Sequence, residues 1–508
     1  MTTRRTRAVP SPADVIFGIV LVVSAVVRGV LAINTDGDLP RHLRVGSEIL
    51  SNGLFFTDRF SWTMQGQPFV PYEWGSEVLY TLAHRAAGLP GVILLMGVAL
   101  AAAYALLYLL LVKLGMDPLL AMLTSIAAAA AGSFHWLARP HVFSYVAVVG
   151  LMALLESSVV GHQSSQERRP KTDSRRLLLT ILLFAAWANL HAGFLFGLVL
   201  IGMYLVGDVL ERWVPLSEER RPSRIGRDAA LLAAALAGTC INPSGPGVIV
   251  HVASYFQKGW LVDITNEMQS PDFHAVIGRT FLVLLLLCLL ILARSGRRPS
   301  WQHLIVFLGT TAFALESKRH VALWALTGFP LVMLHANSWW HSASWKPFAR
   351  LRDGLAQGAQ LAHAGLWSLV PVAMLAVAAA LDGSLGGIRL IPDHFDPMAF
   401  PVRVVERARA AGLQGRMYND FVWGGFILYA WPEQKVFIDG QSDFYGVPLN
   451  QLYLSIRQEE PGWERRLDSL GVDMVLTPGS TPLAWTLGSS PGWTVADSAD
   501  GAIRYARH

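Results

Sequence analysis

Two aspartates, Asp36 and Asp38, are the first charged residues after an apolar run of membrane length at residues 15–33. A carboxylate at the outer end of a span can stay ionised in a protein groove, where it suits the role of general base for a hydroxyl or amine nucleophile. A plainer interpretation fits equally well, because a solvated aspartate here can cap the helix that begins near Leu39. The sequence leaves both interpretations open.

Cationic residues recur at other predicted outer ends of spans. Arg139 stands before Pro140 and His141 in a short turn between two apolar runs. A charge near the membrane centre costs about 2.5–3.5 kcal/mol on insertion scales, so a cation flanked by apolar helices usually has a partner. Arg139 is therefore a candidate phosphate ligand, and snorkelling to the interface is the alternative.

A second cationic group, Lys318, Arg319 and His320, breaks the pattern in which outer loops avoid positive charge. An anionic ligand would compensate for these charges. Internal ion pairs with Glu267 or with the two aspartates would do so equally well.

Histidines are the remaining candidates for binding roles. His191 interrupts an apolar segment, where a lone histidine is more often a packing residue than a catalyst. The acidic loop at Asp439 and Asp443 lacks the spacing of a calcium loop, and a strand-to-turn transition explains it better. No metal-binding residue is predicted, because no pair of histidines has a short ligand spacing, but a divalent metal stays open. The histidines on the predicted outer side are His42, His141, His191 and His320.

Composition indicates a membrane protein. The chain has 508 residues, of which 53% are hydrophobic and 15% are charged, against about 25% charged in soluble domains. The formal net charge of +5 does not indicate nucleic-acid binding, because the basic residues form short clusters between apolar runs. Cys240 and Cys288 both fall inside apolar runs, so no disulfide framework is predicted.

The hydropathy pattern predicts a polytopic α-helical membrane protein with about eleven transmembrane helices. Basic clusters occupy alternate loops, at residues 168–176, 212–227, 294–298 and 346–352, on the side of the N-terminal arginines. This bias places the N-terminus in the cytoplasm. We expect the first run to be a retained span, because it is long and lacks a clear cleavage site. The spans start near Val15, Leu89, Leu119, His141, Leu177, Gly193, Ala229, Thr280, Trp301, Val321 and Gly365.

Two outer segments differ from the spans. The first external loop, residues 34–88, is rich in aromatic residues, and residues 54–62 read as helices lying in the membrane interface. After Asp382 the composition shifts to soluble α/β, which predicts a transmembrane domain at 1–384 and an extracytoplasmic α/β domain at 385–508. The expected elements of the second domain are helices at 396–412 and 463–470, strands at 416–419, 435–439 and 472–477, and a hairpin of 493–497 with 502–506.

Short motifs along most of the chain resemble those of bacterial multi-pass proteins that are similar to the GT-C superfamily of polyprenyl-phosphate-dependent glycosyltransferases. The first external loop carries several of them. The matching positions are Asp38, His42, Gly46, Leu50, 58–63, Glu73, Trp74, 139–141, 189–194, Asn242, Pro243, Glu267, 270–273, Arg319, His320, Asn419, 423–425, Asp439, Gly440, Asp443 and Tyr445.

The resemblance implies an activity and a site. In that superfamily the first external loop holds a catalytic acidic residue, which carries over to Asp38 or Asp36. The usual adjacent acidic pair is split here by Gly37, and Arg41 follows Pro40 where an aromatic or small residue is common. The choice of base therefore stays open. The residues expected to bind substrate are His42, Glu73, Arg139, His141, His191, Glu267, Lys318, Arg319 and His320.

The implied reaction moves a hexose or pentose from a polyprenyl-phosphate donor to a glycan, lipid or protein acceptor at the outer face of a bacterial cytoplasmic membrane. Two other classes of function fit parts of the pattern. A transporter or lipid-handling protein would bind an anionic substrate without catalysis, although transporters place ionisable residues near the midplane. An assembly protein would use its outer domain to bind a partner. Polar residues that gather at one predicted face favour the enzyme.

Overall fold

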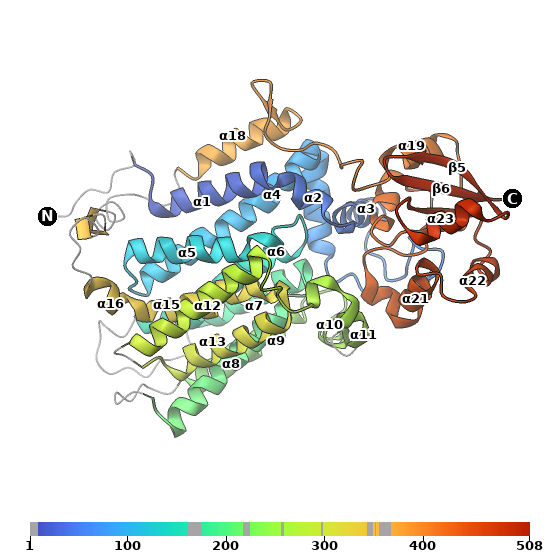
Figure 1. The fold of residues 1–508 in the computed structure, drawn as a ribbon. Helices are drawn as coiled ribbons and strands as arrows, with labels where there is room; N and C mark the ends of the chain where they lie inside the picture. The colour runs from blue at the N-terminus through green and yellow to red at the C-terminus, as the bar shows by residue number, and fades with distance from the viewer. Residues whose placement is uncertain are drawn as a thin grey trace.

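The structure, a computed structural model, describes residues 9–160, 174–216, 224–255, 259–295, 298–342, 349–350, 352–354 and 367–508. The described helices form an elongated bundle, and the C-terminal sheet with its helices lies at one end of it (Figure 1). The span start expected near Gly365 lies outside the described residues. So do the N-terminal arginines and part of the basic loops, namely Arg168, Arg169, Lys171, Arg220, Arg221, Arg297 and Lys346.

Apolar helices build the bundle, and local signals mark their ends. At the start of α5, the carboxylate of Asp117 accepts hydrogen bonds from the N–H groups of Leu119 and Leu120, and Pro118 stands in the first turn. The helices are α1 (Pro12–Val22), η1 (Val23–Val27), α2 (Gly29–Asn34), α4 (Trp74–Lys113), α5 (Pro118–Gly132), η2 (Ser133–His135), α6 (His141–Val160), α7 (Ser174–Leu190), α8 (Phe194–Trp213), α9 (Ile225–Thr239), α12 (Val276–Arg294), α13 (Trp301–Glu316), α14 (Val321–Leu326), α15 (Gly328–Met333), η6 (Leu334–Ala336), α16 (Asn337–Ser342) and α18 (Leu369–Ala380).

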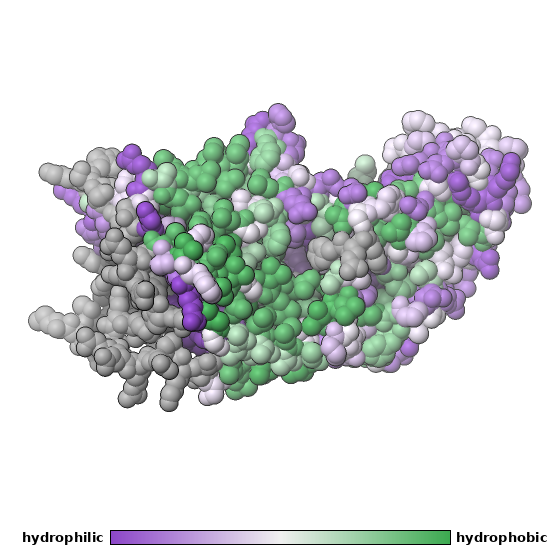
Figure 2. Space-filling view, turned by 90° about the horizontal axis from the view of Figure 1, so that it is seen from below, coloured by the Kyte–Doolittle hydropathy of each residue, from purple (hydrophilic) through white to green (hydrophobic). Residues whose placement is uncertain are grey.

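Four described helices are long and apolar enough to cross a membrane: α4, α5 with its extension η2, α8 and α12. Shorter apolar helices occupy Pro12–Val27, His141–Glu156 and Leu369–Ala380. Apolar residues cover the middle of the bundle, whereas the end with the C-terminal elements is more polar (Figure 2). The helical membrane character agrees with the prediction, and the count of eleven spans stays a prediction.

Helix α4 begins earlier than the span predicted near Leu89. It starts at Trp74 and is interrupted at Ala87 and Gly88, where Gly88 has a φ of 58°. Glycine adopts this conformation without steric cost, so the interruption separates an outer helical segment from the apolar span. The outer segment carries Glu77, which faces the preceding helix of the external loop.

That helix, α3 (Asp38–Asn52), packs on the outer segment of α4. Its buried residues include Leu39 and Leu43, one helical turn apart. Gly46 lies so close to α4 that a Cβ atom there would be 2.1 Å from the carbonyl oxygen of Glu77. This close approach places the first turn of α3, with Asp38, against the outer ends of the bundle helices.

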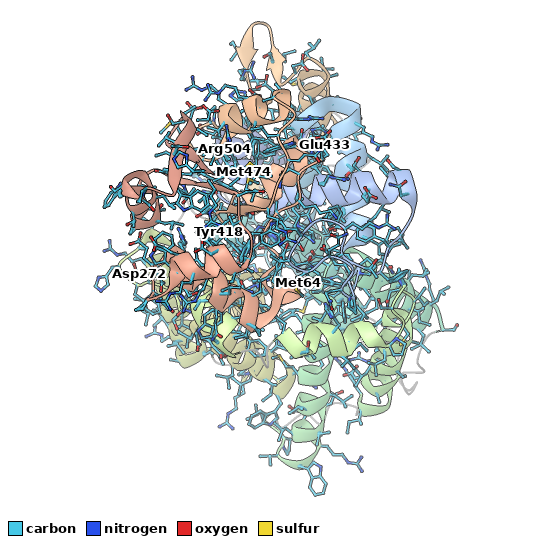
Figure 3. All side chains as sticks on the ribbon, turned by 90° about the vertical axis from the view of Figure 1, so that its right-hand side faces the viewer. Met64, Asp272, Tyr418, Glu433, Met474 and Arg504 are labelled. Atoms are coloured by element: carbon cyan, nitrogen blue, oxygen red, sulfur yellow. The ribbon has the colours of Figure 1, made fainter. Side chains whose placement is uncertain are left out.

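The aromatic segment at residues 54–62 is not helical, so the prediction of helices there is wrong. The carboxylate of Asp58 accepts hydrogen bonds from the backbone N–H groups two and three residues further on and fixes a turn. Trp62 donates its indole N–H to the carbonyl of Met417. Met64 packs against a hydrophobic cluster of the C-terminal elements that includes Tyr418 and Phe437 (Figure 3). The segment therefore ties the first external loop to the C-terminal elements.

The C-terminal elements form a four-stranded sheet with helices around it. The strand order is β3-β4-β6-β5, in which β3 and β4 are parallel and the other pairs antiparallel. The expected terminal hairpin is present as β5 and β6. The elements are β1 (Ser384–Leu385), β2 (Ile388–Arg389), α19 (Val402–Ala410), β3 (Met417–Asn419), α20 (Gly424–Ala430), α21 (Ser442–Arg457), α22 (Trp463–Ser469), β4 (Met474–Pro478), α23 (Pro482–Ser489), β5 (Trp493–Ala499) and β6 (Ala502–Arg507).

Residues 435–439 do not form the predicted strand. Among these described residues, only Val436 makes a bridge, with Ser61 of the first external loop. The side chain of Asn419 takes the place of a neighbouring strand: its oxygen accepts from, and its nitrogen donates to, the backbone of residues 437–438, both at 2.8 Å. Side-chain bonding of this kind offers the backbone an alternative to a sheet ladder.

Candidate active site

Three carboxylates converge on one guanidinium at the end of the bundle that faces the C-terminal elements. Nη2 of Arg139 lies 2.7 Å from Oδ2 of Asp36 and 3.0 Å from Oδ2 of Asp38. Its Nη1 lies 2.9 Å from Oε1 of Glu267. These residues come from the α2–α3 junction, the turn before α6 and the 3-10 turn η4 (Asn266–Met268). We call the four residues the arginine–carboxylate cluster.

Local hydrogen bonds hold the cluster in place. The backbone N–H of Asp38 donates to Oδ1 of Asp36 at 3.0 Å, which orients the two acids relative to each other. The backbone carbonyl of Arg139 accepts a hydrogen bond from the hydroxyl of Tyr80 on α4 at 2.8 Å. The turn before α6 is therefore joined to the helix that supports α3.

The acids of the cluster differ in proton affinity. Burial raises the pKa of Asp38 to about 6, although Arg139 acts in the opposite direction. Burial also favours a raised pKa for Glu267, but Arg139 and His135 outweigh it and hold that pKa below its usual range. At neutral pH Glu267 is thus a fixed anion, whereas Asp38 can take up a proton close to neutrality.

Two predicted histidines lie beside the cluster in a group with His135. The ring centroids of His135 and His141 are 4.1 Å apart, and those of His141 and His191 are 6.3 Å apart. Nδ1 of His191 lies 2.7 Å from the hydroxyl oxygen of Ser144. Nε2 of His135 lies 3.6 Å from Oε2 of Glu267. His135, four residues before Arg139, was missed in the sequence although it precedes the same turn.

His42 and Glu73 belong to a neighbouring acidic group. Nδ1 of His42 lies 3.2 Å from Oε1 of Glu77, and Oε1 of Glu73 lies 3.7 Å from Nε2 of His191. Burial raises the pKa of Glu73 to about 7. Burial opposes the charged form of His42, but its bond to Glu77 and the nearby acids outweigh this and raise its pKa. Glu73 therefore also exchanges a proton close to neutral pH.

Arg41 joins this region to the C-terminal elements and was assigned no role in the sequence. Its Nε lies 3.1 Å from Oδ1 of Asp439 and its Nη1 lies 3.7 Å from Oε1 of Glu77, and it also donates to Gln441. The hydroxyl of Tyr445 donates to Oδ2 of Asp439 at 3.0 Å. Two sequence features indicate a role for Arg41. It stands where the resembling group commonly has an aromatic or small residue, and the acidic loop at Asp439 fits no metal spacing.

Two glycines bring the C-terminal elements against Gly37 and Asp38 at the start of α3. A Cβ atom on Gly440 would lie 2.1 Å from Oδ1 of Asp38, so any side chain there would displace the carboxylate. A Cβ atom on Gly425 would lie 2.0 Å from the carbonyl oxygen of Gly37. Asp38 therefore lies between the helical bundle and the C-terminal elements.

The second cationic group packs against the turn that carries Glu267. Lys318 and Arg319 lie in the 3-10 turn η5 (Lys318–His320) after α13. Nζ of Lys318 lies 2.7 Å from Oδ1 of Asn266, and Nη1 of Arg319 lies 3.7 Å from Sδ of Met268. Both partners belong to η4, the turn that carries Glu267. Within the described residues Arg319 forms no ion pair and affects Glu267 at longer range.

The candidate residues do not form a metal site in this arrangement. Nδ1 of His320 lies 3.3 Å from the carbonyl oxygen of Phe313, in the preceding helix α13. Among the residues that the structure describes, no group of three or more His, Cys, Asp or Glu side chains is arranged to hold a metal ion. The carboxylates of the cluster instead share the Arg139 guanidinium.

The arrangement of bundle, outer helix and C-terminal elements is that of a GT-C-like fold, as predicted. The archaeal oligosaccharyltransferase AglB from Archaeoglobus fulgidus, in complex with an inhibitory peptide and a dolichol-phosphate, superposes with a TM-score of 0.56 at 10% identity over 98% of this chain and 74% of that chain. The apo form of the oligosaccharyltransferase from the same organism gives a TM-score of 0.56 at 12% identity, with the same coverage.

A second protein, from another organism, has a similar structure. ArnT from Cupriavidus metallidurans, bound to undecaprenyl phosphate, gives a TM-score of 0.53 at 11% identity over 97% of this chain and 96% of that chain. No protein-family model and no curated protein sequence matches the chain. The likeness to these solved structures is one of fold.

Proposed function

We propose that this chain is a glycosyltransferase that moves a sugar from a polyprenyl-phosphate donor to an acceptor at the outer face of the cytoplasmic membrane. The observation that carries the proposal is the arginine–carboxylate cluster, which places a carboxylate with a pKa of about 6 at the end of an apolar bundle. The similar structures hold dolichol-phosphate and undecaprenyl phosphate, which supports a lipid phosphate as part of the donor here.

In the proposed reaction Asp38 acts as the general base. The acceptor hydroxyl attacks the anomeric carbon of the donor sugar, and the bond from that carbon to the phosphate oxygen breaks. The electron pair leaves with the polyprenyl phosphate, and the hydroxyl proton passes to the carboxylate of Asp38. Asp36 and Arg139 orient this carboxylate, so less of the barrier goes into arranging the reacting groups.

Arg319 is the stronger candidate for the departing phosphate. The sequence makes both Arg139 and Arg319 candidates for binding phosphate, but the Arg139 guanidinium is already shared by three carboxylates. Arg319 is partly exposed, lies beside the turn of Glu267, and has Lys318 next to it. A guanidinium binds two phosphate oxygens at once and would stabilise the negative charge that develops as the sugar leaves.

The neighbouring polar group would bind the sugar. Glu73, His42 and His191 supply donors and acceptors suited to hydroxyl groups; Glu73 lies beside His191, and His42 pairs with Glu77. His141 and His320 would support the site without contacting the sugar, because both bond to backbone carbonyls in the structure. Contacts between the donor sugar and these side chains would determine whether the enzyme transfers a hexose or a pentose.

The proposal includes the orientation of the chain. We infer that about eleven helices span the membrane, with the N-terminus in the cytoplasm, and that residues 385–508 form an α/β domain outside it. Support comes from the position of the C-terminal elements at the end of the bundle that holds the cluster (Figure 1). The acceptor hydroxyl would then approach from the extracytoplasmic side.

The test is turnover by the purified chain in liposomes that contain polyprenyl-phosphate sugars labelled in the sugar. A panel of hexose and pentose donors, supplied with a cell-envelope extract as the source of acceptor, should yield free polyprenyl phosphate and a labelled product for at least one donor. Movement of intact donor across the liposome membrane, without cleavage of any donor, would instead identify a transporter or lipid-handling protein.

A further inference from the structure

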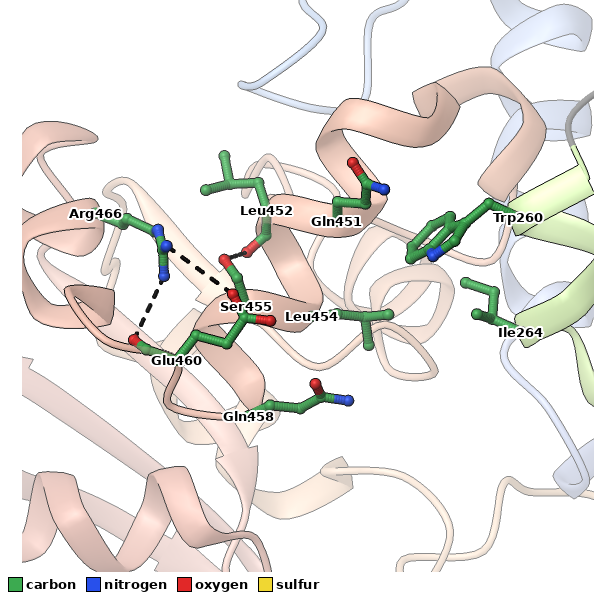
Figure 4. Close-up of a pocket in the computed structure, with 9 residues that line it drawn as sticks. All are labelled: Trp260, Ile264, Gln451, Leu452, Leu454, Ser455, Gln458, Glu460 and Arg466. Atoms are coloured by element: carbon green, nitrogen blue, oxygen red, sulfur yellow. Dashed lines mark hydrogen bonds and ion pairs between the residues drawn. The ribbon is translucent and has the colours of Figure 1, made fainter.

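A groove lies beside the candidate active site, between the external helix α11 (Gly259–Ile264) and α21 of the C-terminal elements. Its volume is about 570 Å³, within the roughly 300–1,000 Å³ of ligand sites. Trp260 and Ile264 form one wall and face Gln451 and Leu454 on the other, and Arg466 closes one end (Figure 4). None of these residues belongs to the arginine–carboxylate cluster.

Both walls of the groove lead directly to the cluster. Helix α11 ends at Ile264, three residues before Glu267. Helix α21 begins just after Gly440, the residue that lies against Asp38, and Asp443 in its first turn is 3.9 Å from His251 of α10 (Gly247–Tyr255). Both walls are therefore joined through the chain to segments that contact the cluster.

The chemistry of the lining is that of a surface for sugar rings. The partly exposed indole of Trp260 offers one flat apolar face, on which the C–H face of a ring can pack. Around it stand the amides of Gln451 and Gln458, with donors and acceptors for hydroxyl groups. Charges of both signs are present, because Arg466 contacts Glu460, with Nη2 4.0 Å from Oε2.

Other occupants fit the groove less well. An extended peptide is bound by main-chain hydrogen bonds at a sheet edge or by apolar pockets for its side chains. Here no strand edge lines the groove: one wall is the short helix α11 and the other is mainly α21, whose interior backbone groups are bonded within the helix. A hydrocarbon chain would leave the amides and the charged groups of the lining without partners when it buried them.

The separation from Asp38 sets the size of the ligand. Gly440, which lies against Asp38, is eleven residues before Gln451 on the groove wall, and α21 bends at Gly446 between them. The groove lining shares no residue with the arginine–carboxylate cluster, so a ligand that contacts both Asp38 and Trp260 has to be longer than one sugar.

We propose that this groove binds an oligosaccharide, so that the acceptor of the reaction is a glycan chain whose end reaches Asp38 while its inner sugars pack on Trp260. This inference rests on the proposed function for the role of the glycan as acceptor. The binding of the glycan itself is independent of the donor and of turnover.

The test is isothermal titration calorimetry on the full chain in nanodiscs, with cellohexaose, maltohexaose, chitohexaose and α-1,6-mannohexaose as probes. At least one hexasaccharide should bind, and glucose, mannose and N-acetylglucosamine should bind at least tenfold more weakly. Trp260→Ala should weaken binding of that hexasaccharide at least tenfold. Trp485→Ala, which removes an exposed tryptophan from α23 outside the groove, should leave it unchanged.

A second variant keeps the test decisive if Trp260→Ala does not fold. Gln451 on α21 and Gln458 just after its end are both exposed, so Gln451→Ala combined with Gln458→Ala should fold and still weaken hexasaccharide binding. Absence of binding to every probe, or binding that neither variant changes, would overturn the inference. So would a hydroxyl-bearing peptide that binds in a manner dependent on Trp260 while the saccharides do not.

The outcome also separates this inference from the proposed function. If donor is cleaved but no hexasaccharide binds, the glycan groove is wrong and the glycosyltransferase stands. If a hexasaccharide binds through Trp260 but no donor is cleaved, the groove is right and the proposed reaction is wrong.

Discussion

Asp38 owes its basicity to two opposing effects of its surroundings. Burial raises its pKa to about 6, and the Arg139 guanidinium 3.0 Å away limits that rise. An ordinary aspartate, with a pKa of about 3.9, would stay ionised but would be a weaker base. The cluster therefore gives a carboxylate that is mostly ionised at neutral pH and still accepts a proton.

This balance predicts the pH dependence of turnover. Because the raised pKa leaves Asp38 protonated in acid, kcat/KM should be constant above pH 7 and fall about tenfold per unit below pH 6. Glu73, with a pKa of about 7, could produce a similar limb. The Glu73→Gln variant separates them: it should retain the limb near pH 6, whatever its maximal rate. A rate that stays flat down to pH 4.5 would contradict the assignment of Asp38.

Arg139 is shared by three carboxylates, and its removal gives a second prediction. In Arg139→Ala, Asp36, Asp38 and Glu267 lose their shared counter-charge. We expect turnover to drop at least a hundredfold, as for loss of one electrostatic group in an active site. We also expect the acids to acquire affinity for Mn²⁺, which prefers carboxylate ligands.

Calorimetry with Mn²⁺ alone checks this, without reference to turnover. The wild type should bind Mn²⁺ at least tenfold more weakly than the variant, and Arg319→Ala, which leaves the cluster intact, should resemble the wild type. Equal Mn²⁺ affinity in the wild type and in Arg139→Ala would show that the guanidinium does not fill a cation site.

At the scale of elements, the position of Asp38 depends on the close packing of α3 on α4. A Cβ atom on Gly46 would lie 2.1 Å from the backbone oxygen of Glu77, so Gly46→Ala forces the helices apart. We expect a loss of about 1–3 kcal/mol of stability, typical of overpacking, and reduced turnover. Thermal unfolding in detergent measures the first effect.

The matched control is Gly202→Ala on α8, where an added Cβ atom meets no atom within 4 Å. This variant should lose neither stability nor activity. Equal unfolding temperatures for the two variants would mean that the α3–α4 contact is not as tight as described.

The elements differ in how well the sequence predicts them. Helices with a long apolar pattern and a clear start signal, such as α5 after Asp117, begin where expected. The strand expected at 435–439 fails, because the side chain of Asn419 satisfies the backbone there. A local pattern does not contain that information. Likewise Arg41 pairs with Asp439 across 398 residues of sequence, so neither signal alone revealed a shared role.

Polar residues also gather where the sequence pattern gave no reason to expect them. Toward the far end of α6, Glu156 accepts hydrogen bonds from Tyr204 at 2.5 Å and lies 3.2 Å from Nε2 of His303. These side chains come from three helices and satisfy one another inside the bundle. Their spacing within apolar runs shows no common face until the helices are packed together.

At the scale of the whole molecule, the site depends on two parts of the chain that meet at Asp38. The bundle supplies the acids and cations, and the C-terminal elements supply Gly440 and the partner of Arg41. This arrangement requires the C-terminal elements to lie outside the membrane if the acceptor comes from there. The orientation is therefore open to a direct test.

Cysteine labelling in intact cells provides it. In a background with Cys240→Ser and Cys288→Ala, Ser480→Cys on the C-terminal elements should react with a membrane-impermeant maleimide. Val214→Cys, exposed after α8 beside a basic loop, should react only after the membrane is permeabilised. The reverse pattern would place the cluster on the cytoplasmic side and contradict the proposed orientation.

The central claim is that the cluster cleaves a lipid-linked sugar with Asp38 as the base. The most direct measurement compares donor binding and donor cleavage in Asp38→Asn, with Glu464→Gln on the exposed surface of α22 as the matched control. We predict that Asp38→Asn binds the polyprenyl-phosphate sugar within about threefold of wild type, and that its release of polyprenyl phosphate falls by at least a hundredfold. Glu464→Gln should match wild type in both. Cleavage of the donor by Asp38→Asn at the wild-type rate would contradict the role of Asp38 as the base.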